Sequence, residues 1–587
     1  MGNRGKNDSE RLLQQLYFRL MPVQVITLFI NTINAFIDSL ITSRYLGTEA
    51  MAAIGLFAPV SALLGMAYVL ISGVQVLCSN HLGRGDTGKV SSLFSTCLVV
   101  LGGAGILIGA LCFAFRAQLA AFLGAAGNAA PLLEDYIAGC SIGIVAQVLS
   151  GLLMSILPLN NDSRMSMAGT VVMIVTNVSL DLVFAICTDM GTLGMGLATS
   201  ISYLLSAGLL MSSFLKKNKL VRFSFRSLRF GDMPSAARLG MPSLLFNAGC
   251  TVKSFVLNQV LLSTGSIAAI AAMSVLNNIC SILGAIPCGS AKVAIILGGI
   301  YYGEEDRRNM CTLLKTALAI TASLSIVVTA ALMLGSSAVS SLFYAPHTEA
   351  WIITRRMLMI FPSFLVFNSI YGIFTNLYQC QGQVGFVNVM SFAENILIAL
   401  LSALGVGVLG SDAVWLAFPL SEILCVLAIA ASVFIRHGGV TFTAQDWLKL
   451  APDFGVDEQD RIDISVTSMD SVIQISEQIV AFCNAKGLDR KTCMLSGLSV
   501  EEMAGNIVRH GFKGQHRPVI DIRVIYKNGG VTIRLRDNCR AFDPLAYTQQ
   551  FVSDDPAANI GIRMICGLAR DVVYLNNIGM NVLLVKV

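Results

Sequence analysis

Long apolar stretches recur along most of the chain, and they constrain its fold more than any other feature. Between about residues 16 and 435, apolar segments of roughly 20 residues or more follow one another, each long enough to cross the hydrocarbon core of a bilayer. Of the 587 residues 55% are hydrophobic and only 13% are charged, too few for a fully solvated surface. We predict about twelve spanning helices, at residues 17–45, 51–78, 90–115, 132–157, 164–187, 193–215, 238–264, 269–300, 312–336, 355–379, 384–409 and 412–435.

Basic residues predict the orientation of these helices. Arg4, Lys6 and Arg11 precede the first predicted span, and the basic run KKNKLVRFSFRSLRF (216–230) follows the sixth. Loops rich in lysine and arginine stay on the cytoplasmic side, so both segments are expected there. An even number of spans also places the C-terminal tail in the cytoplasm. We therefore expect a multi-pass protein of the plasma (inner) membrane, embedded in the lipid bilayer, with both termini cytoplasmic.

The first half of the apolar region resembles the second half. RLMPVQVITLFINTINAFID (19–38) aligns with RLGMPSLLFNAGCTVKSFVLN (238–258), which pairs Pro22 with Pro242 and Asp38 with Asn258. Six helices followed by six more in the same orientation form a parallel repeat, and transporters built this way bind substrate between the halves. The predicted divisions are a cytoplasmic N-terminus (1–15), an N-terminal lobe (16–215), a basic loop (216–237), a C-terminal lobe (238–435), a polar linker (436–460) and a soluble domain (461–587).

Four polar residues inside predicted spans mark a candidate ion site. Asp38 lies deep in the first span, where a carboxylate costs roughly 2.5 kcal/mol or more unless something compensates it. Asn177 and Asp181 are one turn apart on the fifth span and share a face, and Thr199 lies on the sixth. Together they could bind Na⁺ through oxygen ligands or carry protons. The alternative is that each is a structural polar residue bonded to a neighbouring backbone.

Residues 15–437 resemble the MATE (multidrug and toxic compound extrusion) family, in its DinF-like branch. The resemblance rests on IDSLITSRYLGTEAMAAIGLFAP, GVQVLCSNHLGRGDTGKV, NVSLDLVF and LGMGLATSIS. It implies cation-coupled antiport, with H⁺ or Na⁺ as the coupling ion and amphipathic small molecules as exported substrates. The four polar positions named above match the family pattern by residue type. Pro22 matches the proline of the first helix, whose bending in the family accompanies protonation, so we interpret it as a hinge.

The C-terminal lobe departs from the pattern of the N-terminal lobe. Ala399 stands where Asp181 stands, so the ion site is expected in the N-terminal lobe alone. Charged residues nevertheless fall within spans of the C-terminal lobe, namely Lys253, Glu394 and Glu422. An unpaired charge there is costly, so we expect a Lys–Glu pair. The pair is either structural or helps to bind a charged substrate.

From residue 461 onward the pattern changes to that of a soluble α/β domain. RIDISV predicts a strand, and Ser468 and Asp489 each predict the start of a helix, the second running through His510. VIDIRVIYKNGGVTIRLRDN predicts a hairpin closed at Asn528. A helix near Gly561 and a final pair of strands complete the domain. We predict a sandwich with its helices on one side of a mixed sheet.

Glu502, Asn506 and His510 lie at four-residue intervals on the second of these helices, so they share one face. Taken alone they could be only a polar helix face. RDNCRAFDP (536–544) follows a strand, however, and NIGIRMICGLARD opens a helix, where backbone N–H groups can receive phosphate.

These three segments, in this order, resemble the GHKL (Bergerat-type) ATP-binding fold, in its RsbW-like branch of anti-sigma-factor serine kinases. The resemblance implies ATP and Mg²⁺ as ligands, with Asn506, His510, Asp537 and Gly561 at the nucleotide and Asn506 on Mg²⁺. Glu502 is then the catalytic residue that would orient or deprotonate an attacking hydroxyl. The second segment lacks the usual Asp-x-Gly-x-Gly glycines, and QQFVSDDPAAN before Gly561 predicts a short lid, which leaves kinase turnover open.

Two hypotheses about function follow. The first is a cation-coupled multidrug antiporter with a cytosolic ATP-binding regulatory domain, which could also bind a cytosolic partner protein. The second is a membrane-tethered serine/threonine kinase or anti-sigma-type switch whose MATE half acts as a sensor. The chain has no GxxxxGK[ST] motif, which argues against an ABC-type pump, and no phospho-acceptor motif of a histidine kinase. Nucleic acid is not expected as a partner, because the tail has no basic stripe interleaved with aromatic residues.

Overall fold

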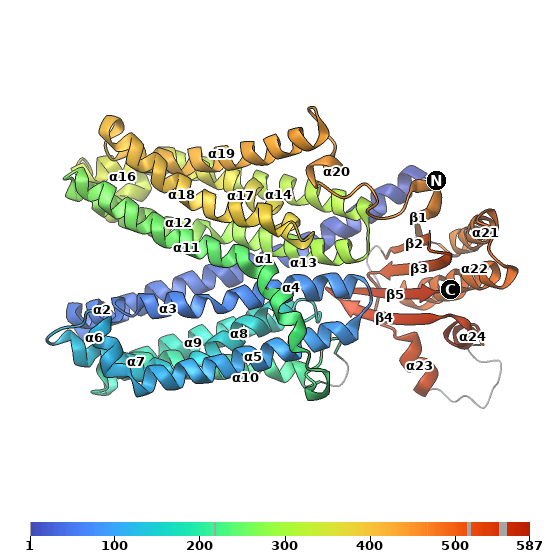
Figure 1. The fold of residues 1–587 in the computed structure, drawn as a ribbon, viewed down its shortest axis with the longest axis horizontal. Coiled ribbons are helices and arrows are strands. Elements are labelled where there is room, and N and C mark those ends of the chain that lie inside the picture. The colour runs from blue at the N-terminus through green and yellow to red at the C-terminus, as the bar shows by residue number, and fades with distance from the viewer. Residues whose placement is uncertain (1, 217–218, 467, 514–517, 551–559) are drawn as a thin grey trace.

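The apolar stretches form helices that gather into two bundles, and an α/β domain covers one end of both bundles (Figure 1). The computed structural model describes residues 2–216, 219–466, 468–513, 518–550 and 560–587. The first bundle, here called the N-lobe, contains α1 (Gly2–Ile41), α2 (Gly47–Gly55), α3 (Ala58–Gly65), α4 (Ala67–Gly83), α5 (Thr87–Ala114), α6 (Arg116–Phe122), α7 (Ala129–Ser141), α8 (Ile144–Ile156), α9 (Ser163–Cys187) and α10 (Gly191–Phe214). A π-helical turn, Thr42–Leu46, joins α1 to α2.

The second bundle, here called the C-lobe, repeats this order of long and short helices. It contains α11 (Met233–Ser263), α12 (Ile267–Leu283), α13 (Ala285–Gly303), α14 (Arg307–Leu334), α15 (Ser336–Phe343), α16 (Glu349–Ile360), α17 (Phe364–Cys380), α18 (Val384–Leu409) and α19 (Asp412–His437). Short 3₁₀ turns lie at Phe225–Ser227, Phe230–Asp232 and Phe361–Ser363. The predicted fold class, two parallel helical repeats followed by an α/β domain, is confirmed.

The helices account for most of the predicted spans. Among the described residues, ten helical segments are long and apolar enough to cross a membrane, and the pair α7 and α8, bent by 49°, makes an eleventh. The remaining predicted span is α11, which has 31 residues and is long enough to cross. Asn247 and Lys253 lie within it and lower its hydropathy. The count of eleven spans falls one short of the predicted twelve because α11 contains polar residues, and not because a predicted helix is missing.

Equivalent loops of the two lobes fold in the same way. The Asp86 carboxylate accepts a hydrogen bond from the backbone N–H of Lys89 at 2.9 Å and caps α5. Asp306 accepts from the N–H of Asn309 at 3.0 Å and caps α14. Asp86 and Asp306 are separated by the same spacing as Pro22 and Pro242. The two loops, 83–86 and 303–306, are therefore counterparts in the repeat, and both face the C-terminal domain.

The C-terminal domain is a five-stranded sheet with helices on one face (Figure 1). Its elements are β1 (Arg461–Val466), α21 (Met469–Ala485), α22 (Arg490–Asn506), a π-helical turn (Ile507–Gly511), β2 (Ile520–Lys527), β3 (Gly530–Asp537), α23 (Pro544–Gln550), α24 (Ile560–Leu568), β4 (Asp571–Asn577) and β5 (Met580–Lys586). The strand order is β1-β2-β3-β5-β4. Residues 551–559, which hold most of the predicted lid, lie outside the described residues.

The predicted mixed sheet is wrong, because all four strand pairings are antiparallel. Two tight hairpins produce this pattern. Asn528 and Gly529 (φ 53° and 78°) join β2 to β3, and Ile578 and Gly579 (φ 53° and 79°) join β4 to β5. Positive φ at both central residues is typical of the turns that match the twist of paired strands. A positive φ strains the β-branched side chain of Ile578, whereas glycine or asparagine adopts it more easily.

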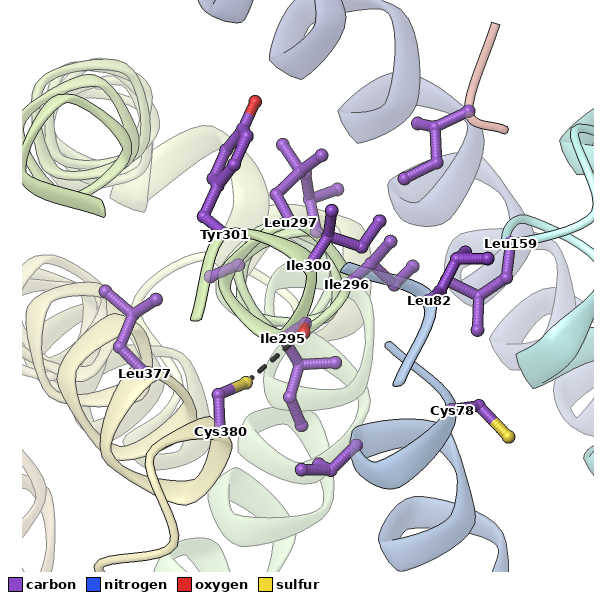
Figure 2. Close-up of a cluster of buried hydrophobic side chains, with 14 of the residues drawn as sticks. Cys78, Leu82, Leu159, Ile295, Ile296, Leu297, Ile300, Tyr301, Leu377 and Cys380 are labelled. Carbon is purple, nitrogen blue, oxygen red and sulfur yellow. Dashed lines mark hydrogen bonds between the residues drawn. The ribbon is translucent and has the colours of Figure 1, made fainter. Parts of the chain in front are cut away.

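The two faces of the sheet have different partners. Ile522, Ile533 and Val585 point toward α21, α22 and α24 and form the core of the domain. On the opposite face β5 contributes Val582 and Leu584 to the apolar core of the membrane domain, the same cluster that contains Leu82 and Leu159. Figure 2 shows this core around α13, where the Cys380 thiol donates a hydrogen bond to the carbonyl of Ile295 at 3.2 Å. The C-terminal domain is thus packed onto the helices.

The segment predicted as a polar linker is also packed against the membrane domain. It contains α20 (Ala444–Trp447) and a 3₁₀ turn at Glu458–Asp460. Leu448, Leu450 and Phe454 are buried in the same apolar core. The Arg307 guanidinium donates hydrogen bonds to the carbonyls of Phe454 and Pro452 at 3.0 and 2.9 Å. Because polar residues alternate with these anchors, the segment is polar in composition and yet fixed in place.

Glycine contacts inside the N-lobe give a test of its packing. A Cβ added to Gly196 on α10 would lie 2.7 Å from the carbonyl oxygen of Tyr136 and 2.8 Å from the backbone nitrogen of Cys140, both on α7. We expect Gly196→Ala to destabilise the protein by about 1–3 kcal/mol through overpacking, seen as a lower melting temperature in detergent. Gly208→Ala, on the same helix with nothing within 4 Å, is the control and should leave it unchanged. Equal melting temperatures for both variants would contradict the close packing.

Candidate functional sites

A cavity of about 550 Å³ opens inside the N-lobe. Residues of α1, α3, α4, α8, α9 and α10 line it, and many of them are polar. The polar lining residues are Asn31, Asn34, Asp38, Ser61, Tyr68, Gln147, Ser150, Asn177, Thr199 and Tyr203. The cavity therefore offers a polar interior within a bundle whose outer surface is apolar.

Three of the four predicted ion-site residues, Asp38, Asn177 and Thr199, line this cavity, and the fourth, Asp181, interacts with Asp38. The side-chain amide of Asn34 donates to an Asp38 carboxylate oxygen at 3.2 Å and to the side-chain oxygen of Asn177 at 2.8 Å. Asp181 is fully buried on α9, one turn beyond Asn177, and its carboxyl group is close enough to that of Asp38 for the two to interact directly. Asp38 lines the cavity, whereas Asp181 is not among its lining residues.

The acceptors in this cluster lack donors. One Asp38 oxygen, both Asp181 oxygens and the side-chain oxygen of Asn34 are buried without a hydrogen-bond partner within the described residues. The side-chain nitrogen of Asn177, a donor, also lacks a partner there, so acceptors outnumber donors by four to one among the unsatisfied groups of the cluster, where buried polar groups are normally paired. The arrangement suits a proton shared between two carboxyl groups or a small cation held by oxygen ligands.

Thr199 and Pro22 lie where the sequence places them but show no special interaction. Thr199 lines the cavity, and its hydroxyl donates to the carbonyl of Met195 one turn earlier at 3.1 Å, an ordinary bond within a helix. Pro22 lies inside α1, which runs as a helix from Gly2 to Ile41 without a break. Proline has no N–H, so the carbonyl one turn before it receives no hydrogen bond from this position.

Asn34 is the residue of this site that sequence reasoning missed. It links α1 to α9 by bonding Asp38 and Asn177 with one amide group. Its position four residues before Asp38 in an apolar span was a usable signal, because such residues share a helix face.

The charged residues of the C-lobe form a second buried polar cluster. The side-chain amide of Asn368 donates to Glu394 at 3.3 Å and to Glu422 at 3.1 Å, so it bridges the two carboxylates. Lys253 interacts with Glu394 electrostatically, but the expected direct Lys–Glu pair is not formed in the part of the chain described. Its ammonium group lies 5.7 Å from the centre of the Phe418 ring instead. An aromatic face thus supplies part of the compensation that the sequence assigned to a carboxylate.

The C-terminal domain contains a cavity of about 510 Å³ beside its sheet. Asn506, His510 and Asp537 line it, so the structure brings together three of the four residues predicted to bind nucleotide. Gly561 does not line it, but the next residue of α24, Ile562, does. A Cβ on Gly561 would lie 2.3 Å from the carboxyl carbon of Glu502. Glu502 therefore packs against the start of α24, outside the lining of the cavity.

Asp537 is held in place by two hydrogen bonds. Its carboxylate accepts from the backbone N–H of Cys539 and from the side-chain amide of Asn581, both at 2.8 Å. Burial raises the pKa of Asp537, although these two donors lower it. Burial, with a contribution from the Asp537 charge, also raises the pKa of the Cys539 thiol to about 12, so this cysteine is not a nucleophile at neutral pH.

Tyr574 and Asn581 on the last two strands also line the cavity, and sequence reasoning missed both. The Tyr574 hydroxyl and the side-chain amide of Asn576 each donate to the Asn581 oxygen at 2.7 Å. The signal was NNIGMN, which places asparagines in both strands of an otherwise apolar hairpin.

The described residues contain no cluster of three or more His, Cys, Asp or Glu side chains able to hold a metal ion. The Mg²⁺ contact at Asn506 stays a prediction, because Mg²⁺ bound to a nucleotide takes most of its ligands from phosphates and water and needs no such cluster. Asn506 lines the cavity, where its side-chain oxygen would be the ligand.

Comparisons with known proteins agree with the two-part architecture. The MatE family model matches residues 24–183 and 242–404. The model of the histidine kinase-like ATPase domain matches residues 466–586. The chain is 22% identical over 441 residues to the multidrug export protein MepA of Staphylococcus aureus, covering 74% of this chain and 97% of that protein. MepA of Staphylococcus saprophyticus is 22% identical over 413 residues, covering 69% and 90%.

Solved structures share the fold of the membrane domain. A MATE crystal structure in complex with MaD3S superposes with a TM-score of 0.66 at 22% identity, covering 71% of this chain and 94% of that one. A MOP superfamily transporter from Pyrococcus furiosus, described as having a binding pocket of reverse polarity, gives 0.66 at 21% identity, covering 75% and 97%.

The cavity of the C-terminal domain gives a binding test. We expect Asp537→Asn to weaken binding of a non-hydrolysable ATP analogue by roughly ten-fold or more, because a hydrogen bond to a buried carboxylate contributes about 1.5–3 kcal/mol. Isothermal titration of the purified full chain measures this affinity. Asp571→Asn makes the same change in an ion pair with Lys586 elsewhere in the domain and is the control. Unchanged affinity in Asp537→Asn would show that Asp537 does not contact the nucleotide.

Proposed function

The chain belongs to the MatE family and carries a C-terminal histidine kinase-like ATPase domain, and on this premise we propose that it is a cation-coupled multidrug antiporter regulated by adenine nucleotide. The observation that carries the proposal is the group of donor-less acceptors at Asp38 and Asp181. The names of the relatives, multidrug export proteins, support amphipathic xenobiotics as the exported class.

The carboxyl pair supplies the ion coupling. Two adjacent carboxylates in a low-dielectric bundle repel one another, so removing both protons is costly unless a cation replaces them. A shared proton or one Na⁺ removes this cost. The pair therefore binds the coupling ion strongly when it is closed off and releases it when water or another cation reaches it.

Competition for the same pair explains antiport. Asp38 faces the cavity, whereas Asp181 lies behind it. A cationic amphipathic substrate that enters the cavity compensates the negative charge of Asp38. The pair then binds the coupling ion less strongly. Binding of one cation thus favours release of the other, which is the requirement for exchange. The glutamates of the C-lobe, bridged by Asn368, line no part of this cavity and are assigned a structural role.

The basic loops and the expected ATP ligand support one orientation of the protein in the membrane. We place the C-terminal domain and both termini in the cytoplasm, because the positive loops lie on that side and because ATP is available there. The domain is then a regulatory module in which Asp537 would hold the adenine and Asn506 would hold Mg²⁺ with the phosphates. Mg²⁺ would supply charge neutralisation of the phosphates at this site.

The alternative is a serine/threonine kinase or anti-sigma-type switch, and the position of Glu502 argues against it. A catalytic base must reach the hydroxyl that it deprotonates, yet the Glu502 carboxyl group packs on Gly561 outside the cavity lining. We therefore favour binding of nucleotide without phosphotransfer.

Replacement of Asp38 tests the antiport mechanism. We expect Asp38→Asn to reduce efflux of a fluorescent cation from proteoliposomes at least ten-fold under an imposed proton or sodium gradient, because an amide cannot load or unload the ion. Asp181→Asn should do the same. Asp135→Asn, an exposed carboxylate on α7 of the same lobe, is the matched control and should transport normally. Normal efflux by Asp38→Asn would reject the ion role of the pair.

Phosphotransfer tests the alternative. We expect the full chain, incubated with cytosolic proteins and ATP labelled on its γ-phosphate, to transfer no label to serine or threonine, because Glu502 does not reach the cavity. Glu502→Gln is the comparison. Transfer by the unchanged protein that disappears in Glu502→Gln would establish the kinase instead.

A further inference from the structure

The sheet of the C-terminal domain binds loops of both lobes. On the N-lobe side, a Cβ on Gly85 would lie 2.9 Å from the Leu584 side chain, so the α4–α5 loop touches β5. The side-chain amide of Asn161, between α8 and α9, donates to the side-chain oxygen of Asn576 at 2.6 Å. The guanidinium of Arg19 packs against Gly579 in the β4–β5 turn, but this stretch of α1 also contacts the C-lobe, through a hydrogen bond of 3.2 Å between the hydroxyls of Tyr17 and Thr321.

On the C-lobe side the contact is ionic and buried. Arg523 and Arg534 pair with the two oxygens of Asp306 at 2.6 and 2.9 Å. Glu304 pairs with both Arg534 and Arg536. These side chains are all less than a tenth exposed. Burial would raise the pKa of Asp306, but its two arginine partners hold it well below the usual range, so the carboxylate is charged and docked at neutral pH.

The lobes themselves touch at this end. A Cβ on Gly303 of α13 would lie 2.0 Å from the backbone oxygen of Asn80 on α4, and one on Gly83 would lie 2.1 Å from the oxygen of Ile300. The Asn80 amide donates to the carbonyl of Cys380 on α17 at 3.1 Å. The domain therefore lies across the junction of two lobes that are closed against each other on its side.

We propose that the C-terminal domain is a conformational clamp, which holds the two lobes together at its end of the membrane domain and is loosened when nucleotide binds. The inference rests on the proposed function, because export requires the cavity to open toward the cytoplasm in one state, and we infer that the lobes separate on that side when it opens. A rigid sheet bound to both lobes must leave one of them before that side can open. The buried ion pairs are lost only at high cost, so the N-lobe contacts are the ones that release.

A chain of asparagine side chains connects the clamp to the nucleotide cavity. Asn161 donates to Asn576, Asn576 donates to Asn581 at 2.7 Å, and Asn581 donates to Asp537 at 2.8 Å. All three amides point the same way and end on the carboxylate, so they polarise one another. Asn581 and Cys539 both bond one oxygen of Asp537. An adenine amino group that donates to the carboxylate therefore draws its negative charge away from the bond to Asn581. Binding of nucleotide thereby weakens the contact that joins β4 to the N-lobe.

The clamp is tested with Glu304→Gln, which removes the charge that Arg534 and Arg536 share. We expect the efflux rate of the full chain in proteoliposomes without nucleotide to rise about five-fold or more, within the usual range of coupling between two sites. Amide hydrogen exchange of loops 83–86 and 303–306 should rise in parallel. Arg536→Gln removes the other partner of the same ion pair. It provides the same test of the clamp if Glu304→Gln does not fold. Asp571→Asn is the control and should change neither readout.

The nucleotide link is tested with Asn161→Gly. Asn161 has a φ of 60°, which glycine adopts without strain, so this variant removes the amide and keeps the loop. We expect Mg-ATP to accelerate efflux by the unchanged protein and to increase exchange in 157–162. Asn161→Gly should bind ATP with unchanged affinity but lose the response to it.

The outcomes separate this inference from the proposed function. Efflux and loop exchange that are unchanged in both Glu304→Gln and Arg536→Gln overturn the clamp, even if Asp38→Asn abolishes transport. An ATP response that persists in Asn161→Gly overturns the asparagine link. If the unchanged protein transports nothing under either gradient, the antiporter function fails, while hydrogen exchange of the two loops still decides whether the domain holds the lobes together.

Discussion

The account depends on two carboxyl groups, Asp38 and Asp181, that interact inside a membrane bundle. Among the described residues, three of their four oxygens have no hydrogen-bond donor. Lipid offers nothing that would compensate their charge, so a proton or metal cation must do so whenever the site is closed. The polar cavity beside Asp38 gives a second cation access to the same charge. In the mechanism that we propose, electrostatics makes ion loading and substrate loading mutually exclusive, without a dedicated gate.

We propose that the C-terminal domain controls a second step of the transport cycle, the closure of the two lobes. The face of its sheet that packs on the membrane domain makes two kinds of contact. Val582 and Leu584 make apolar contacts, and Arg523, Arg534 and Arg536 form ion pairs. The ionic half binds the 303–306 loop of the C-lobe. The apolar and asparagine half lies on the N-lobe and is connected to the nucleotide cavity. Regulation can thus act on the rate of opening without touching the carboxyl pair.

The sequence allowed the local elements and the grouping of polar residues to be predicted, because both depend on periodicity and on the cost of charge in lipid. Asp38 and Asn177 meet through Asn34, and Asn506, His510 and Asp537 line one cavity. Features that depend on tertiary packing were not predicted. Lys253 lies beside an aromatic ring rather than a glutamate, and the segment from 438 to 460 is anchored by a few apolar residues within a polar composition. The docking arginines on β2 and β3 looked like ordinary solvated residues of an alternating strand.

The central claim is most directly tested by measuring the cation released when substrate binds to the purified protein. In weakly buffered detergent solution, a pH indicator reports released protons, and bound radioactive sodium reports displaced Na⁺. The account predicts that binding of an amphipathic cation releases about one proton or one Na⁺ per protein molecule, in line with a single shared carboxyl pair. Binding of the same substrate with release of neither ion would contradict it.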